Sequence, residues 1–192
     1  MKRGLKLLVL TDAWATLALG MLGPIYAIFV ENIGGDILDA SWAFFAFTFT
    51  SGIVMYLLSF LENKIKHKEK LILFSYALIA IGCLGYYFVY NQFTLLLVQI
   101  ILGFATALLS PAYDALYSHF VIKKEEASDW GLWESMGYIV GAVAAIIGGY
   151  VASIFGFKIL FLVMFAVSLL GVFTAINLLR KKRYLNKNTK LF

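Results

Sequence analysis

The sequence has 192 residues, of which 62% are hydrophobic, 17% aromatic and 14% charged. This leaves too little polar surface for a water-soluble globule, so the composition predicts a membrane protein. The formal net charge of +5 indicates anionic lipid headgroups as a partner, and nothing implies nucleic acid. Cys83, the only cysteine, can form neither an internal disulfide nor a multi-cysteine metal site.

Six apolar stretches follow one another, each near the roughly 20 residues that a helix needs to cross about 30 Å of hydrocarbon. They cover residues 7–30, 38–61, 71–90, 93–120, 131–154 and 157–179. The connections between them are short, and a basic tail occupies residues 180–192. We therefore predict an all-α membrane protein with a single six-helix transmembrane domain over residues 1–192.

The positively charged residues outside the apolar stretches lie almost entirely on one side of the predicted membrane. Of the 16 Lys and Arg residues, 15 lie before the first stretch, between the second and third, between the fourth and fifth, or after the sixth. The other side carries Glu31, Asp36, Asp39 and the single cation Lys158. By the positive-inside rule, both termini are predicted to be cytoplasmic in a multi-pass protein of the cytoplasmic (inner) membrane.

A short motif occurs in the first and the fourth stretch, at residues 20–27 and 107–114. It contains the only two prolines, Pro24 and Pro111, each followed two positions later by a tyrosine. The first stretch leaves the cytoplasm and the fourth returns to it, which is typical of a 3+3 inverted repeat. Each proline removes a backbone hydrogen bond, so we expect both helices to bend there, around a site. A chance match between two aromatic-rich helices is the alternative.

Polar residues share one face on three of the stretches when they are plotted at about 100° per residue. The fourth stretch is polar along its whole length, the first carries a similar stripe, and the fifth has a carboxylate followed by small residues. The residues predicted to line a substrate or proton pathway are Asp12, Thr16, Tyr26, Gln99, Thr106, Ser110, Tyr113, Asp114 and Glu134.

Three of these residues are acids within apolar stretches. Because ionisable groups are costly at membrane depth, Asp12, Asp114 and Glu134 are expected to face a bundle interior or a watery cavity. Alternatively, all three lie near cytoplasmic helix ends, where they can reach water or cap a helix. Trp130 and Trp133, next to Glu134, are interpreted as interfacial anchors.

Enzymatic motifs are missing from the sequence. It contains no glycine-rich phosphate loop with a following lysine, no His-Glu-x-x-His, and no Ser or Cys beside a His on one helix face. We therefore predict no enzymatic activity, no cofactor and no metal site.

The chain resembles half of a major facilitator superfamily transporter over nearly its whole length, and the resemblance is best from residue 95 to 175. Gln99-x-x-x-Gly103 is similar to the Arg-x-x-x-Gly at the start of the family's fourth helix. Residues 123–127 and 148–158 are similar to its loop between helices four and five and to its turn into helix six. The family's Gly-x-Leu-x-Asp-Arg-x-Gly-Arg-Arg loop is degraded at residues 59–68, where Asn63 replaces the Asp and both glycines are gone.

The resemblance implies one half of a twelve-helix transporter. In the family, helices one and four line the cavity, and helices two and five contribute to the contact between halves. A second copy in the same orientation would complete the arrangement as a C2 dimer, with inter-subunit packing at the small residues Gly141, Ala145 and Gly148. This implies transport of a small solute by alternating access as a homodimer of half-transporters.

Two alternatives remain open. The chain could be a transport-inactive protein that binds or regulates a partner membrane protein, or one half of a split hetero-oligomeric transporter. For a transporter, neutral or cationic solutes are favoured over anions, because no Lys or Arg lies at membrane depth.

Overall fold

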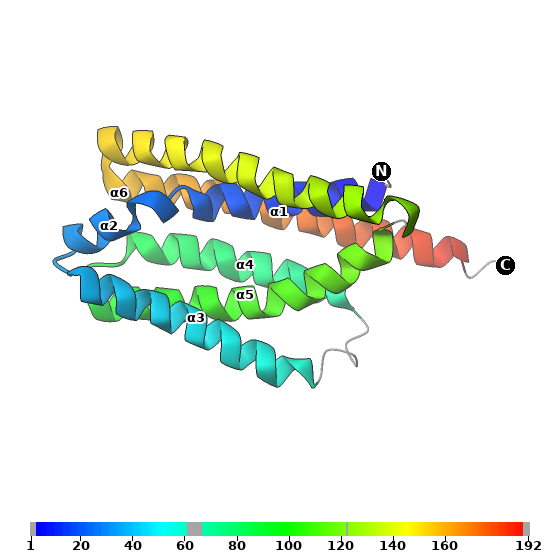
Figure 1. The fold of residues 1–192 in the computed structure, drawn as a ribbon, viewed down its shortest axis with the longest axis horizontal. Coiled ribbons are helices and arrows are strands. Elements are labelled where there is room, and N and C mark those ends of the chain that lie inside the picture. The colour runs from blue at the N-terminus through cyan, green and yellow to red at the C-terminus, as the bar shows by residue number, and fades with distance from the viewer. Residues whose placement is uncertain (1–2, 61–66, 122, 190–192) are drawn as a thin grey trace.

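The structure is a computed structural model that describes residues 3–60, 67–121 and 123–189. The described residues form long helices along one axis, without strands (Figure 1). The elements are α1 (Arg3–Gly20), η1 (Gly23–Ile25), α2 (Tyr26–Asn32), α3 (Ile37–Ser59), α4 (Lys68–Tyr87), α5 (Gln92–Phe120), η3 (Lys123–Glu125) and α6 (Glu126–Thr189).

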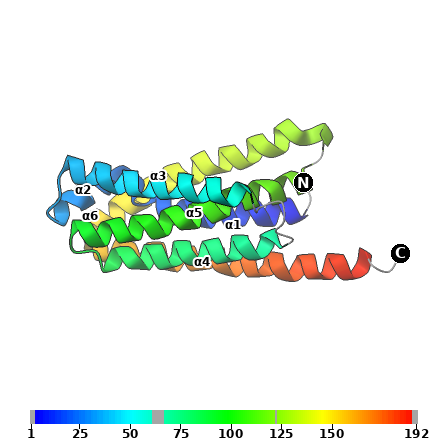
Figure 2. The same ribbon diagram turned by 90° about the horizontal axis from the view of Figure 1, so that it is seen from below.

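The last element, α6, consists of two helical arms that meet at Gly156. Gly156 has φ 79° and ψ 170°, a backbone conformation that is open to glycine and costly for other residues. The chain reverses direction there, so residues 126–155 (the first arm) and 157–189 (the second arm) run in opposite directions (Figures 1 and 2). The apolar stretches 131–154 and 157–179 lie on the first and second arm respectively.

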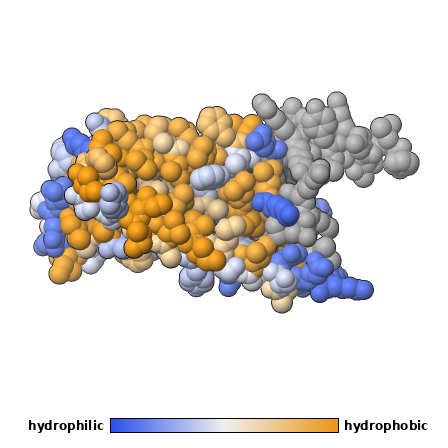
Figure 3. Space-filling model, turned by 90° about the horizontal axis from the view of Figure 1, so that it is seen from above, coloured by the Kyte–Doolittle hydropathy of each residue, from blue (hydrophilic) through white to orange (hydrophobic). Residues whose placement is uncertain are grey.

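Among the residues that the structure describes, five helices are long and apolar enough to cross a membrane: Gly4–Asn32, Ile37–Ser59, Lys68–Tyr87, Gln92–Phe120 and Lys123–Asn177. The last of these contains both arms of α6. Apolar side chains cover most of the face seen in Figure 3, and hydrophilic residues gather at the two ends. The helices and this distribution support a multi-pass membrane protein.

The first span is interrupted rather than continuous. α1 ends at Gly20, and the Ile25 N–H donates to the Leu22 carbonyl (3.1 Å) in the 3-10 turn that contains Pro24. Proline fits the start of such a turn, because an N–H there has no helical partner. The helix α5 is different, since it continues through Pro111 to Phe120.

The helices pack in a simple order. α1 packs on α6, α6 on α4, α4 on α5, and α5 on α3. A buried aromatic core joins α2, α4 and the second arm, where the Phe161 ring lies 4.9 Å from Phe29 and 5.3 Å from Tyr86. Within the described residues, the backbones of α1 and α5 scarcely approach each other, and neither do those of α5 and α6.

The small residues of the first arm pack against α1 of the same chain. A Cβ atom at Gly148 would overlap the Met21 carbonyl, and a Cβ atom at Gly20 would lie 3.0 Å from Ala144. The prediction that Gly148 belongs to an inter-subunit contact is therefore wrong, because Gly148 is already buried against the backbone of Met21, the residue after α1. Gly141 and Ala145 are half-buried, and their contact with another subunit stays a prediction.

Replacing Gly148 by alanine tests this close approach. We expect Gly148→Ala to lower the free energy of unfolding by about 1–3 kcal/mol, because the new methyl group pushes α1 away from the first arm. Gly149→Ala is the matched control, since a Cβ atom there meets nothing within 4 Å. Thermal unfolding of both variants in detergent gives the comparison, and equal stabilities would contradict the packing described here.

Candidate functional site

One group of polar side chains is centred on Asp12 of α1. The Trp133 Nε1–H donates to Asp12 Oδ2 at 2.7 Å, and the Tyr76 hydroxyl donates to Asp12 Oδ1 at 3.5 Å, a long and weak bond. Tyr76 belongs to α4 and Trp133 to the first arm of α6. Tyr113 of α5 packs against Trp133, with ring centroids 5.2 Å apart. We refer to Asp12, Tyr76, Tyr113 and Trp133 as the Asp12 cluster.

Aromatic rings connect α5 to the first arm in this region. The Tyr117 ring stacks on Tyr113 at 5.9 Å, and it lies 5.4 Å from Trp133 and 4.8 Å from Trp130. The Tyr117 hydroxyl donates to the backbone carbonyl of Asp129. Because the two backbones scarcely approach each other, these long side chains make the contact.

The Tyr113 hydroxyl is unusual within the described part of the chain. It is the only buried side-chain polar atom there without a hydrogen-bond partner, on a side chain that is 2% exposed. It lies near enough to Asp12 and Asp114 to interact with their charges. A buried hydroxyl without a partner costs free energy, so it calls for an explanation.

A second polar contact joins Tyr26, at the start of α2, to Gln99 of α5. The Gln99 Nε2–H donates to the Tyr26 hydroxyl oxygen at 2.6 Å, and Gln99 is 6% exposed. The Tyr86 hydroxyl of α4 lies close to the same amide. This contact satisfies a buried amide that would otherwise be costly.

The structure thus brings the predicted residues together in two places. Asp12 lies with Tyr113 and near Asp114, and Tyr26 lies with Gln99. Thr16, Thr106 and Ser110 are half-buried, whereas Glu134 is exposed on the first arm. These three and Glu134 take no part in the contacts described above.

Neither Tyr76 nor Trp133 is among the residues predicted to line the pathway. Trp133, interpreted from the sequence as an interfacial anchor, turns its indole N–H toward Asp12, 121 positions earlier in the chain. Only the packing of the first arm on α1 reveals this partner. Because Asp12 is expected to face the bundle interior, the sequence indicates that it needs a hydrogen-bond donor. It does not indicate which helix supplies that donor.

The chemistry available at the Asp12 cluster is that of proton and cation binding. Its groups are a carboxylate, two phenol hydroxyls and an indole N–H, with the Asp114 carboxylate nearby. A carboxylate accepts hydrogen bonds when ionised and donates one when protonated. Among the described residues, no three His, Cys, Asp or Glu side chains are grouped to hold a metal ion.

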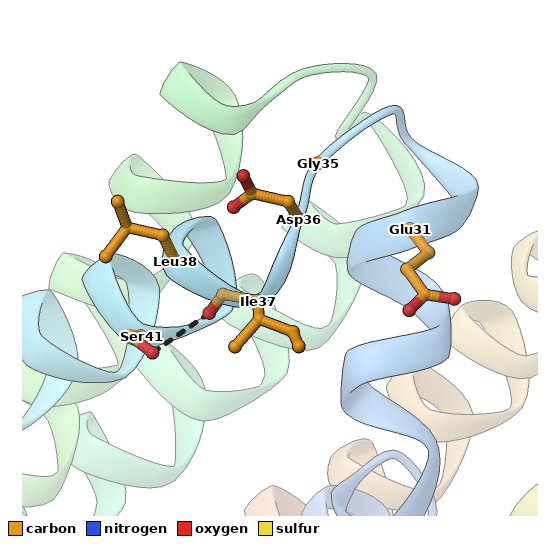
Figure 4. Close-up of a pocket in the computed structure, with 6 residues that line it drawn as sticks. All are labelled: Glu31, Gly35, Asp36, Ile37, Leu38 and Ser41. Carbon is orange, nitrogen blue, oxygen red and sulfur yellow. Dashed lines mark hydrogen bonds between the residues drawn. The ribbon is translucent and has the colours of Figure 1, made fainter.

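A shallow hollow lies at the opposite end of the bundle, around the start of α3 (Figure 4). Its lining residues are Glu31, Gly35, Asp36, Ile37, Leu38 and Ser41. Asp36 caps α3: the Asp39 N–H donates to Asp36 Oδ1 at 2.9 Å, which lowers the pKa of the Asp36 carboxyl below its ordinary value. Asp36 therefore has a structural role in starting α3.

Two tyrosine variants of α5 should change stability in opposite directions. Tyr113→Phe removes the hydroxyl without a partner, so we expect the free energy of unfolding to rise by about 1 kcal/mol. Tyr117→Phe removes the donor to the Asp129 carbonyl, so the free energy of unfolding should fall by about the same amount. Denaturant unfolding in detergent measures both, and a loss of stability in Tyr113→Phe would show that its hydroxyl has a partner.

Comparison with known proteins connects this arrangement to a family. A search of curated proteins finds no match to the chain. A comparison with protein-family profiles matches residues 9–191 to the Major Facilitator Superfamily. The match extends from α1 into the second arm of α6 and includes every residue of both polar contacts, which confirms the resemblance seen in the sequence. The chain belongs to the Major Facilitator Superfamily.

Proposed function

We propose that this protein carries a small solute across the cytoplasmic membrane by alternating access, as a homodimer of half-transporters. Membership of the family indicates membrane transport of a solute in general. The observation that carries the proposal further is that polar side chains of the first span and of α5 meet where the helix backbones scarcely approach each other. Such an arrangement suits two helices that face a pathway.

The proposal counts six spans, with the two arms of α6 taken separately. α1 packs on both arms, with close approaches at Gly20 and Gly171, and α5 packs on both α3 and α4, with close approaches at Gly103 and Gly82. Exchanging α1 with α5, α3 with the first arm and α4 with the second arm therefore maps the first set of contacts onto the second. Each of the two related helix pairs approaches closely at a glycine: a Cβ atom at Gly148 of the first arm would overlap the Met21 carbonyl, and one at Gly103 of α5 would lie 2.5 Å from the Phe47 carbonyl oxygen. This correspondence supports a 3+3 inverted repeat in which α1 and α5 are equivalent.

The outward face of α3 supports a second subunit. The Trp42, Phe45 and Phe49 rings pack in a row on it, with centroids 5.6 and 4.9 Å apart. These side chains are 48–54% exposed, and Ile53 and Tyr56 extend the row along the helix. In the proposed C2 dimer, the first arm of the other subunit covers this row, and the partner's α1 and α5 complete the solute pathway.

The charges and the fold support one orientation in the membrane. α1 begins and α6 ends at the same end of the bundle (Figure 1), and Lys158 lies just after the turn at Gly156, at the other end. We propose that the end with α1's first residue is cytoplasmic, in agreement with the sorting of Lys and Arg in the sequence.

Single cysteines test this orientation. After Cys83 is replaced, Gly35→Cys should react with an impermeant thiol reagent in intact cells, because residue 35 faces outward. Asn188→Cys should react only after the cells are opened. Labelling of residue 188 without residue 35 in intact cells would reverse the proposed topology.

Reconstitution tests transport and assembly together. Proteoliposomes are supplied with a sugar, a quaternary amine and a lipophilic phosphonium cation, and native mass spectrometry in mild detergent gives the oligomeric state. We expect a homodimer and uptake of at least one solute above empty liposomes. Asp114→Asn, which keeps shape while removing charge, should lose that uptake or its pH dependence.

Three outcomes speak against the proposal. A stable monomer that moves none of the solutes favours the partner-binding alternative. Activity that appears only with a different half supports the split transporter. Full and equally pH-dependent uptake by Asp114→Asn shows that Asp114 is structural.

A further inference from the structure

We propose that Trp133 is a positioning residue for Asp12 and that proton binding changes the hydrogen-bond partner of Asp12 from Trp133 to Tyr113. The ionised carboxylate is held by the indole N–H, and the protonated carboxyl donates to the Tyr113 hydroxyl oxygen. This inference rests on the proposed transport function and deepens it, because it makes the contact between α1 and the first arm depend on a proton.

The Trp133 bond has the geometry expected for holding an ionised carboxylate. The indole nitrogen can only donate, and its 2.7 Å distance to Asp12 Oδ2 is typical of a hydrogen bond to a charged oxygen. Such bonds are roughly twice as strong as neutral ones. Neutralising Asp12 therefore weakens the direct side-chain link between α1 and the first arm.

Tyr113 provides the second partner. Its hydroxyl is buried, has no hydrogen-bond partner in this structure, and lies within range of the Asp12 charge. Its ring packs on Trp133 at 5.2 Å, so both partners of the carboxyl come from the same aromatic contact. Burying a hydroxyl without a hydrogen-bond partner costs free energy. That cost is explained if the Tyr113 hydroxyl gains a partner when Asp12 is protonated.

The step is balanced in protons. Asp12 takes one proton from water, and the new carboxyl O–H donates to the Tyr113 oxygen while the Trp133 N–H loses its charged acceptor. The reverse step returns the proton to water and restores the bond to Trp133. In a transporter that rocks between two states, water on different sides can supply and receive that proton.

The groups around Asp12 come from three elements. α4 contributes Tyr76, α5 contributes Tyr113 and Asp114, and the first arm contributes Trp133, which does not titrate. Glu134 follows Trp133, and its side chain is exposed. Asp114 is the other carboxylate that could take up the proton, so the test must distinguish it from Asp12.

The NMR signal of the Trp133 indole N–H directly reports whether Asp12 is ionised. The full chain, labelled with ¹⁵N-tryptophan in lipid nanodiscs, contains four tryptophans, and Trp133→Phe and Trp42→Phe assign two of the indole signals. We expect the Trp133 signal to move with pH between about 4 and about 9. The signal of Trp42, which lies on the outward face of α3 and makes no contact with the Asp12 cluster, should stay fixed as the matched control.

Variants identify the proton site and the second partner. Asp12→Asn should abolish the movement of the Trp133 signal, and Asp114→Asn should keep it. Tyr113→Phe removes the acceptor of the protonated Asp12 carboxyl, so the midpoint of the Trp133 titration should fall by about one pH unit. Trp133→Phe removes the donor to the ionised form, so the midpoint of any pH-dependent uptake should rise by a similar amount.

The inference is overturned if the Trp133 signal does not titrate, or if its titration persists in Asp12→Asn. A titration lost only in Asp114→Asn assigns the proton to Asp114 and overturns it as well. An unchanged midpoint in Tyr113→Phe removes Tyr113 from the switch. Because the signal needs no solute, a failure of transport leaves these results interpretable, and a failure of the switch leaves transport itself untouched.

Discussion

A polar group surrounded by hydrocarbon must find its partner inside the protein, and the contacts between these helices follow from that constraint. Asp12 obtains donors from α4 and from the first arm of α6, and Gln99 obtains an acceptor at the start of α2. Apolar packing could tolerate a small rotation of each helix. These hydrogen bonds define which face of each helix points inward.

The same constraint explains how far the sequence could predict the site. Periodicity placed Asp12 and Tyr26 on one stripe and Gln99 and Asp114 on another, and the structure brings members of the two stripes together. Trp133 was interpreted differently, because tryptophan near a helix end is typical of an interfacial anchor. The hydrogen-bond partner of Trp133 depends on how the first arm packs on α1, and helical periodicity does not predict that packing.

Gly148 shows a second limit of prediction from sequence. A stripe of small residues indicates that another helix approaches closely, but the stripe is identical whether that helix belongs to the same chain or to another. Here the helix that approaches the small residues of the first arm is α1 of the same chain, and Met21, just after α1, covers Gly148. The prolines are similar: both sit in the repeated motif, yet only Pro24 lies in an interruption, since α5 remains helical past Pro111.

The positions at which α1 begins and α6 ends have a consequence for how larger proteins of this kind can be built. Both lie at one end of the bundle (Figure 1), so a linker between two tandem copies would never need to cross the bilayer. Joining the genes of two such units would give one chain with both units inserted in the same direction. After such a fusion each half could accumulate its own substitutions, and a symmetric pathway could become an asymmetric one.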